Sequence, residues 1–116
     1  MAHSKLVRAT EFWPTPHPKY PNTDVKNFLT GAQADQLSVH LLEVKPGGEV
    51  TDHTHEAKWG TAYLIDGEGS VLVNGGWEKA SAGDCLVIPP GASHGFRNTR
   101  SDRSLVILTC FAPPLV

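Results

Sequence analysis

Residues 83–98 read GDCLVIPPGASHGFRN: an apolar run, a Pro-Pro-Gly turn, and then a histidine, His94, in a second extended segment. Upstream of this stretch, His53 and His55 form a His-x-His pair. Because side chains alternate between the two faces of a strand, both members of the pair point to one face, about 6–7 Å apart. Zn, Fe, Cu and Ni all accept imidazole nitrogen as a ligand, and a third histidine from a separate strand would complete the set. The sequence therefore predicts a divalent transition metal bound by His53, His55 and His94.

Turn residues interrupt the chain at intervals of about 8–12 residues, a spacing typical of all-β folds. No window has a convincing 3.6-residue apolar period, so little helix is expected. Asn74-Gly75, between the runs VLV and GWEK, is a strong signal for a two-residue hairpin turn. The expected strands are residues 25–29, 37–44, 50–55, 61–65, 70–73, 77–79, 84–88, 94–98 and 105–111. Short strands in this number predict a small closed or sandwiched barrel, which hides its strand edges.

The N-terminal part of the chain differs from the rest in its proline content. Residues 13–24, WPTPHPKYPNTD, hold four prolines, and proline excludes both a helix interior and a central strand. We expect one domain over residues 1–116, with residues 1–24 forming an N-terminal strand and Pro-rich arm that crosses the surface, and residues 25–116 forming the barrel. His3 and His17, in this N-terminal part, are expected to be solvated.

Composition excludes several classes of function. The formal net charge is −2 and there is no basic run, so a nucleic-acid partner is not expected. No apolar stretch approaches the ~20 residues that a membrane helix needs, and the N-terminus lacks the apolar core of a signal peptide. Cys85 and Cys110 lie in apolar, strand-like runs and are expected to be reduced thiols of a cytoplasmic protein.

Two separated motifs resemble those of the cupins, the RmlC-like jelly-roll superfamily. The motif G-x5-P-x-G-x2-H-x3-N is matched at every fixed position, by Gly83, Pro89, Gly91, His94 and Asn98. The motif G-x5-H-x-H-x(3,4)-E-x6-G is matched by Gly47, His53, His55 and Gly67. The resemblance implies a small single-domain jelly-roll barrel, also described as a double-stranded β-helix, with a metal at the histidines.

One position departs from the cupin pattern. The glutamate ligand of the first motif would fall at residue 60, which is Gly60, or at residue 59, which is Trp59, and neither side chain can bind a metal. The site therefore resembles the three-histidine variants of the family. Glu56 is a candidate substitute: on a regular strand it points away from His55, whereas a kink after His55 would reverse its direction.

The missing carboxylate changes the expected chemistry. A divalent ion held by three neutral imidazoles keeps its full +2 charge, which favours an anionic, chelating substrate such as an enolate or a carboxylate. Among cupins, this arrangement resembles that of the thiol dioxygenases and the diketone-cleaving dioxygenases, which use ferrous iron, so Fe(II) is favoured over Zn, Ni or Mn. Open coordination would also suit zinc as a Lewis acid or water activator.

Further residues are candidates for the surroundings of the metal. His40 either points into the barrel as an acid or base or faces outward, and Tyr63 either offers a phenol near the metal or belongs to the core. Trp59 either forms an apolar wall or packs at the rim, Phe96 shares the parity of His94, and Cys110 is a further candidate for the cavity. The predicted substrate pocket is thus Trp59, Tyr63, Phe96 and Cys110, with His40 and Tyr63 as catalytic candidates.

These observations leave open whether the protein is an enzyme. The favoured hypothesis is a three-histidine Fe(II) dioxygenase acting on a small chelating oxo or thiol compound. The alternatives are a non-enzymatic module that binds or senses a small molecule, and a Zn- or Ni-dependent isomerase or lyase. The resemblance also implies a homodimer, often formed through an exchanged N-terminal strand, with which the Pro-rich arm is compatible.

Overall fold

A computed structural model describes residues 2–116 of the chain, and within them every regular element is a β-strand. The strands are β1 (Thr15–Pro16), β2 (Thr23–Leu29), β3 (Ser38–Val44), β4 (Glu49–His53), β5 (Trp59–Asp66), β6 (Glu68–Val73), β7 (Gly76–Ser81), β8 (Cys85–Ile88), β9 (His94–Asn98) and β10 (Leu105–Ala112). The all-β prediction is confirmed. All the expected strands are present as β2 to β10, with ends that differ from the prediction by at most two residues.

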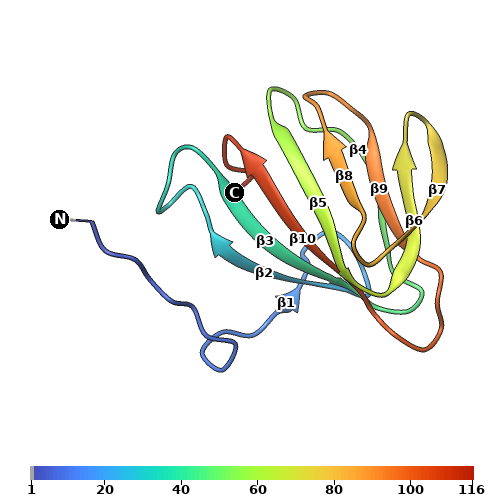
Figure 1. The fold of residues 1–116 in the computed structure, drawn as a ribbon, viewed down its shortest axis with the longest axis horizontal. Coiled ribbons are helices and arrows are strands. Elements are labelled where there is room, and N and C mark those ends of the chain that lie inside the picture. Colours follow the sequence, from blue (N-terminus) through green and yellow to red (C-terminus); the bar gives the residue numbers. More distant parts are fainter. Residues whose placement is uncertain (1) are drawn as a thin grey trace.

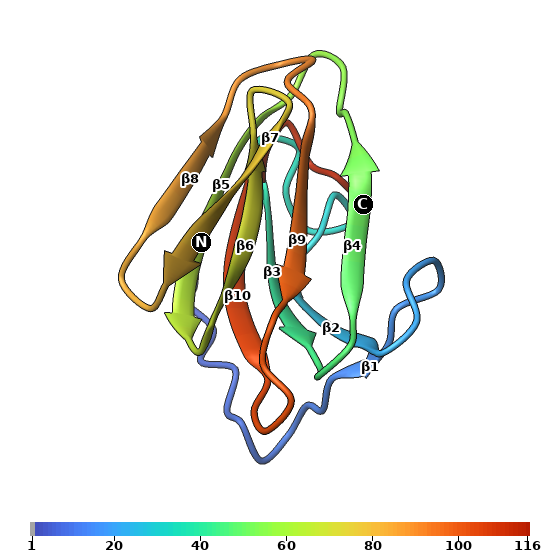
Figure 2. The same cartoon turned by 90° about the vertical axis from the view of Figure 1, so that its right-hand side faces the viewer.

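The strands form two antiparallel sheets that face each other (Figures 1 and 2). One sheet has six strands in the order β1-β2-β3-β10-β5-β8, and the other has four in the order β4-β9-β6-β7. Consecutive strands repeatedly change sheet, so β4 pairs with β9 and β10 lies between β3 and β5. This is the jelly-roll architecture that the motifs implied.

The core lies between the two sheets. Along β10, Leu105, Ile107, Thr109 and Phe111 are buried, and the residues between them are more exposed. This period of two is what a strand shows when one face packs on a core and the other faces outward. Burying each large apolar side chain contributes about 1.5–3 kcal/mol, and these inward faces therefore hold the two sheets together.

Asn74 and Gly75 form the predicted hairpin turn. Their φ angles are 51° and 80°, which is the left-handed pair that a type I′ turn requires. Val73 and Gly76 are the last paired residues of β6 and β7, so the turn contains only these two residues. The register of this hairpin follows directly from the dipeptide.

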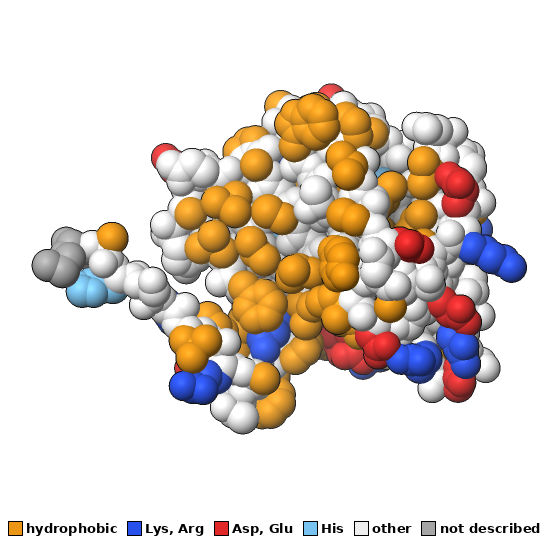
Figure 3. Space-filling model, viewed as in Figure 1, with side chains coloured by type: hydrophobic (Ala, Val, Ile, Leu, Met, Phe, Trp, Pro, Cys, Tyr) orange, Lys and Arg blue, Asp and Glu red, His pale blue; other side chains and the backbone are white. Residues whose placement is uncertain are grey.

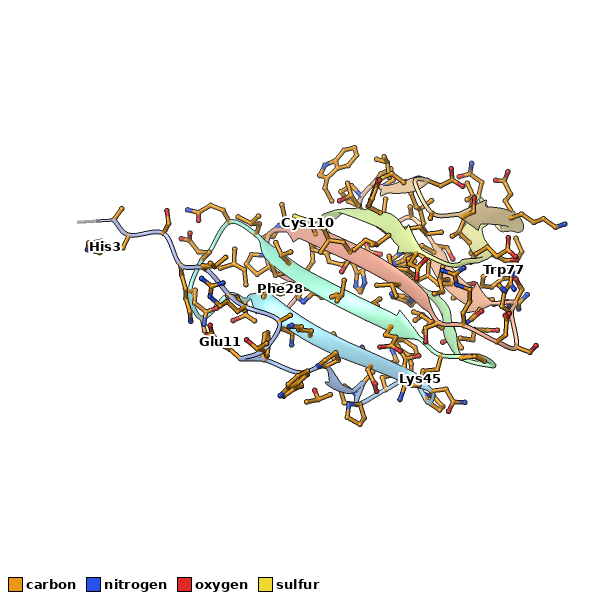
Figure 4. All side chains as sticks on the ribbon, turned by 60° about the horizontal axis from the view of Figure 1, so that its bottom comes forward. His3, Glu11, Phe28, Lys45, Trp77 and Cys110 are labelled. Carbon is orange, nitrogen blue, oxygen red and sulfur yellow. The ribbon has the colours of Figure 1, made fainter. Side chains whose placement is uncertain are left out.

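The Pro-rich segment contains a short strand. Thr15 and Pro16 form β1, which pairs with Val25 and Asp24 at the edge of the six-stranded sheet. An edge position accommodates proline because its outer side needs no hydrogen-bond donor. Phe12 packs on Phe28 of β2, at 6.1 Å between ring centroids, and the chain before it extends as an arm, at whose far end lies His3 (Figures 1 and 4). The exposure of His3 agrees with the expectation.

Large apolar side chains are exposed on the outer face of the six-stranded sheet. They are Trp59, Tyr63, Ile65 and Val87, from β5 and β8, and apolar groups cover much of the face in Figure 3. Residues 2–116 contain no helix that is both long and apolar enough to cross a membrane. The expected homodimer stays a prediction.

Candidate metal centre

Three imidazoles meet at one end of the four-stranded sheet. His53 is the last residue of β4 and His94 is the first of β9, and the two face each other in register. His55 lies two residues beyond β4. One ring nitrogen from each of the three histidines lies within 4.8 Å of the others. The structure thus brings together the three residues that the motifs singled out.

The convergence of His53 and His55 has a different cause from the one the sequence suggested. The expected strand over residues 50–55 ends at His53, so the two side chains do not simply alternate along one strand. Instead, the chain turns after His55, where Ala57 has a φ of 59°. The N–H of Gly91 donates a hydrogen bond of 3.1 Å to the carbonyl of His55. The Pro-Pro-Gly turn before β9 therefore holds His55 in place.

Hydrogen bonds to the backbone orient two of the three rings. His53 Nδ1 lies 2.7 Å from the carbonyl oxygen of Thr51, and His94 Nδ1 lies 3.1 Å from that of Ala92. A carbonyl only accepts, so each Nδ1 carries the proton and each Nε2 keeps its lone pair. Backbone carbonyls commonly orient metal-ligating histidines in this way.

The distances between the rings match the binding of one ion. His53 Nε2 and His55 Nε2 are 3.1 Å apart. Two imidazole nitrogens bound at ~2.1 Å to one ion are about 3.0–3.4 Å apart at octahedral to tetrahedral angles. The ring of His94 lies 4.1 Å from that of His53 and 5.0 Å from that of His55, measured between centroids. This donor set fits a single transition-metal ion.

Burial and neighbouring charges keep His55 and His94 neutral, as metal binding requires. Burial, followed by the neighbouring charges of His53, His94, Lys58 and Lys19, lowers the pKa of His55 to about 4. Burial also lowers the pKa of His94, which is only 2% exposed, and outweighs the hydrogen bond to the carbonyl of Ala92. Both rings are therefore free of the competing proton at neutral pH.

No carboxylate belongs to this cluster in the described part of the chain. Glu56 is exposed, and its carboxylate lies toward the Pro-Pro-Gly turn, since a Cβ built on Gly91 would be 3.5 Å from Glu56 Oε2. Glu56 therefore does not replace the missing ligand here, although the chain does turn after His55.

Phe111 occupies the space beside Gly60, where the family's glutamate would begin. The two residues are directly opposite in the pairing of β5 with β10. A Cβ on Gly60 would lie 2.5 Å from Phe111 Cε1, and the Phe111 ring lies 5.1 Å from the ring of His55. An aromatic ring thus stands in place of the glutamate side chain, and the sequence motif gave no sign of it.

A small cavity of about 50 Å³ adjoins two of the three histidines. Its walls come from both sheets and from the loop after β1, and they are formed by His17, Tyr20, Leu42, Val50, His53, His94, Phe96, Thr109 and Phe111. Phe96 is 2% exposed and contributes to the wall, as its shared parity with His94 suggested. His17 was expected to be solvated and instead lines the cavity.

His40 faces the barrel interior, which was one of the two alternatives for it. It is 3% exposed, and its ring lies 6.1 Å from that of Phe111. Its Nδ1 donates to Asn27 Oδ1 at 2.7 Å, and its Nε2 pairs with Ser38 Oγ at 2.8 Å. Because both ring nitrogens are already engaged, and because burial lowers its pKa, His40 joins β2 to β3 and offers no free group to the cavity.

Three predicted pocket residues lie on the opposite side of the six-stranded sheet from the metal centre. Trp59 is 57% exposed and Tyr63 is 46% exposed, because the inward positions of β5 are Gly60, Ala62 and Leu64. Cys110 alternates with the buried residues of β10 and also faces outward. The expectation that Trp59, Tyr63 and Cys110 line the pocket is wrong. Tyr63 is therefore no longer a catalytic candidate.

Both cysteines are free thiols in the structure. The apolar runs around both cysteines suggested that their thiols would be shielded from solvent. Cys110 is half-buried, whereas Cys85 is exposed. Figure 4 shows Cys110 on β10.

Two facing antiparallel sheets with converging imidazoles at one end define a small jelly-roll barrel with a candidate metal site. The family model for the cupin domain (Cupin_2) matches residues 40–111, and the chain belongs to this family. No curated protein sequence matches the chain.

Several solved structures resemble this fold. A predicted oxalate decarboxylase from Thermotoga maritima is 24% identical with a TM-score of 0.84, covering 94% of this chain and 99% of its own. KdgF from Halomonas sp. is 20% identical with a TM-score of 0.81, covering 94% of each chain. The polyketide cyclase RemF from Streptomyces resistomycificus is 23% identical with a TM-score of 0.81, covering 95% of this chain and 80% of its own. At these identities the likeness establishes the fold alone.

Proposed function

We propose that this protein is a metal-dependent dioxygenase in which His53, His55 and His94 hold one Fe(II) ion and a small chelating oxo or thiol compound is the substrate. The observation that carries the proposal is the composition of the cluster: three imidazoles and no carboxylate, with their ligand atoms within 4.8 Å of one another. Imidazole nitrogen suits iron.

The charge of such a centre selects the substrate class. Neutral imidazoles leave a divalent ion its full +2 charge, and the lowered pKa values of His55 and His94 keep these rings neutral. When bound, Fe(II) would supply a dicationic centre that attracts a chelating anion and a source of electrons for the reduction of dioxygen. Lys58 and Lys19 add positive potential near His55.

The size and the apolar walls of the cavity restrict which ligands can bind beside the metal. Leu42, Val50, Phe96 and Phe111 give it apolar walls, which exclude water and strengthen electrostatic interactions with whatever is bound. A volume of about 50 Å³ is room for only a few water-sized groups, since one water occupies roughly 10–15 Å³ on this measure. This size favours a compact chelating head group.

The names of two similar structures are compatible with the substrate class of this proposal; one names a decarboxylase and the other a cyclase. Oxalate, the substrate named for the Thermotoga maritima protein, is a small chelating dianion, and RemF is described as a polyketide cyclase. Both names point to oxygen-rich compounds, of which a β-diketone or a carboxylate is the simplest representative.

Elemental analysis combined with oxygen uptake tests the proposal. Protein purified without an affinity tag or chelator is expected to contain nearly one iron per chain, and His53→Ala is expected to lose it. With iron, the protein should consume oxygen when given β-diketones, α-hydroxyketones or thiols. Turnover without oxygen, with zinc or nickel bound, would replace the proposal by an isomerase or lyase. Saturable ligand binding without turnover in air and under nitrogen would replace it by a binding module.

A further inference from the structure

We propose that the loop of residues 17–22 forms the outer wall of the metal centre and that His17 Nε2–H donates a hydrogen bond to an oxygen atom of the ligand bound there. This inference rests on the metal site of the proposed function and narrows its substrate class from oxo or thiol compounds to small carboxylates and related oxygen chelators. His17 would be a specificity-determining residue.

The loop is fixed to the barrel at both of its ends. The N–H of His17 donates to the carbonyl of Thr23 at 2.7 Å, and the N–H of Lys45 donates to the carbonyl of Asn22 at 2.8 Å. Pro18 and Pro21 restrict the backbone between these ends. Figure 2 shows the loop beside β4, the strand that ends in His53. These contacts hold the loop in a fixed position against the candidate metal site.

Tyr20 brings the loop into contact with the metal ligands. Its side chain is buried, and its ring lies 5.9 Å from the ring of His53 and 4.7 Å from the ring of His17, measured between centroids. Both His17 and Tyr20 line the same cavity as His53 and His94. Residues from the N-terminal segment thus complete a site whose ligands come from β4, β9 and the loop after β4.

The hydrogen bonds of His17 determine which ring nitrogen carries its proton. Nδ1 accepts the N–H of Lys19 at 3.0 Å and that of Tyr20 at 3.4 Å. A ring nitrogen that accepts has no proton of its own, so the neutral ring is protonated at Nε2. Burial, and then the charges of Lys19 and His53, lower the pKa of His17 and favour this neutral form. Within residues 2–116, no hydrogen bond engages Nε2, which leaves its N–H for a ligand.

A nitrogen donor of this kind recognises oxygen rather than sulfur. An N–H group bonds well to carboxylate or enolate oxygen, whereas thioether and thiol sulfur accept weakly. Lys19 lies next to Tyr20, with its Nζ 5.5 Å from the centre of that ring, and adds positive charge at the outer side of the loop. A small carboxylate that chelates the metal would meet the N–H of His17 and feel the positive potential of Lys19, which also acts on His17 and His55.

Two substitutions separate hydrogen bonding to the ligand from support of the loop. Asparagine places its Oδ1 near the position of His17 Nδ1, so His17→Asn keeps the loop acceptor and loses the reach of Nε2. Glutamine extends its Nε2 toward the position of the histidine Nε2, so His17→Gln keeps a donor and loses the loop acceptor. His3→Ala, on the exposed arm, is the matched control for removal of a histidine.

The experiment measures binding of oxalate and of cysteamine to the Fe(II)-loaded chain under nitrogen, by calorimetry, after the iron content of every variant has been determined. Oxalate is expected to bind His17→Asn about tenfold more weakly than the unchanged protein, the loss of one hydrogen bond to a charged acceptor. His17→Gln is expected to retain most of the affinity, and cysteamine, which offers no oxygen, is expected to bind all variants alike.

The outcomes distinguish this inference from the function on which it rests. Full iron content with equal oxalate affinity in His17→Asn and the unchanged protein overturns the role of His17 and leaves the metal site standing. A loss of oxalate affinity in His17→Gln but not in His17→Asn overturns it also, because the loop support would then be the cause. Failure of the unchanged protein to retain Fe(II) after loading overturns the iron centre of the proposed function itself.

Discussion

Gly60→Ala tests how the core is packed around the metal centre. A Cβ at this position would lie 2.5 Å from Phe111 Cε1 and 2.8 Å from Phe111 Cδ1, much closer than the ~3.5–4.0 Å at which carbon atoms attract. The Phe111 ring is buried and packs near the rings of His55 and His40, at 5.1 and 6.1 Å between centroids. Two imidazoles therefore flank the ring, and the open space beside it is the small cavity of about 50 Å³ that it lines.

The magnitude follows from this overlap. Forcing one extra methyl group into a packed core costs about 1–3 kcal/mol, and the ~0.4–1 kcal/mol that alanine gains over glycine by restricting the unfolded chain offsets only part of it. For a domain of this size, 1 kcal/mol corresponds to a shift of about 4 °C in Tm. We therefore expect Gly60→Ala to unfold up to ~10 °C lower, measured by calorimetry and urea titration of the metal-free protein.

Gly76→Ala and Phe111→Leu supply the controls. At Gly76 an added Cβ would meet nothing closer than the carbonyl oxygen of Val73, at 3.8 Å, so this variant should be as stable as the unchanged protein or slightly more stable. Phe111→Leu removes the ring, so Gly60→Ala should cost less in that background, by about 1 kcal/mol or more. Equal stabilities of Gly60→Ala and Gly76→Ala, or strictly additive effects in the double variant, would refute the reasoning.

Further predictions concern stability, metal binding and assembly. Asn98→Ala should lower the free energy of unfolding by about 2–4 kcal/mol, because Asn98 Nδ2 donates to the carbonyls of Val44 and Arg103 at 2.9 Å each and its Oδ1 accepts the N–H of Arg100; an Asn98→Ala protein as stable in urea as the parent would contradict this. Because burial lowers the pKa of His40 below 6.5, the unfolded chain binds more protons there than the folded one, and stability should fall as pH decreases below ~6.5; His40→Gln should show a shallower decline in urea titrations between pH 7 and pH 5. Metal at one hundred times its Kd should raise the free energy of unfolding by about 2.7 kcal/mol, and an equal effect of metal on His94→Ala would argue against the three-histidine site. The homodimer implied by the resemblance to cupins should appear as a two-chain mass in sedimentation, whereas a single-chain mass would reject it.

Most of the fold could be predicted from the sequence alone. Strand positions followed from turn residues, and the Asn74-Gly75 hairpin followed from backbone conformation alone, because both residues need positive φ. The motif positions have similar local reasons. Gly83 and Gly91 have φ values of 99° and 78°, which side-chain-bearing residues rarely adopt, and Asn98 ties the end of β9 to Val44 and Arg103. Such requirements on backbone conformation and hydrogen bonding can be recognised in a single sequence, because each depends mainly on the type of one residue.

The spacing of the three histidines also predicted that they lie together. The structural reason for their convergence could not be predicted. The alternation rule placed His55 on the strand with His53, whereas the strand ends at His53 and a hydrogen bond from Gly91 holds His55. The identity of the residues was sufficient for the prediction. The geometry depended on a contact between two distant parts of the chain.

The residues that surround the candidate metal centre could not be predicted from local sequence patterns, because they depend on tertiary packing. A period of two divides β5 into two faces but does not say which one is inside, and the larger side chains Trp59 and Tyr63 suggested the wrong face. The inner face carries Gly60 because the ring of Phe111, from a strand far along the chain, needs that space.

The same holds for the outer wall of the site. No spacing in the Pro-rich segment relates His17 to His53, yet the loop after β1 brings both to one cavity. Pairing of β1 with β2, and the hydrogen bond between Lys45 and Asn22, place that loop. Local sequence sets the conformation of a segment, but its position depends on the edges and faces that the rest of the fold leaves available, and only the assembled barrel specifies these.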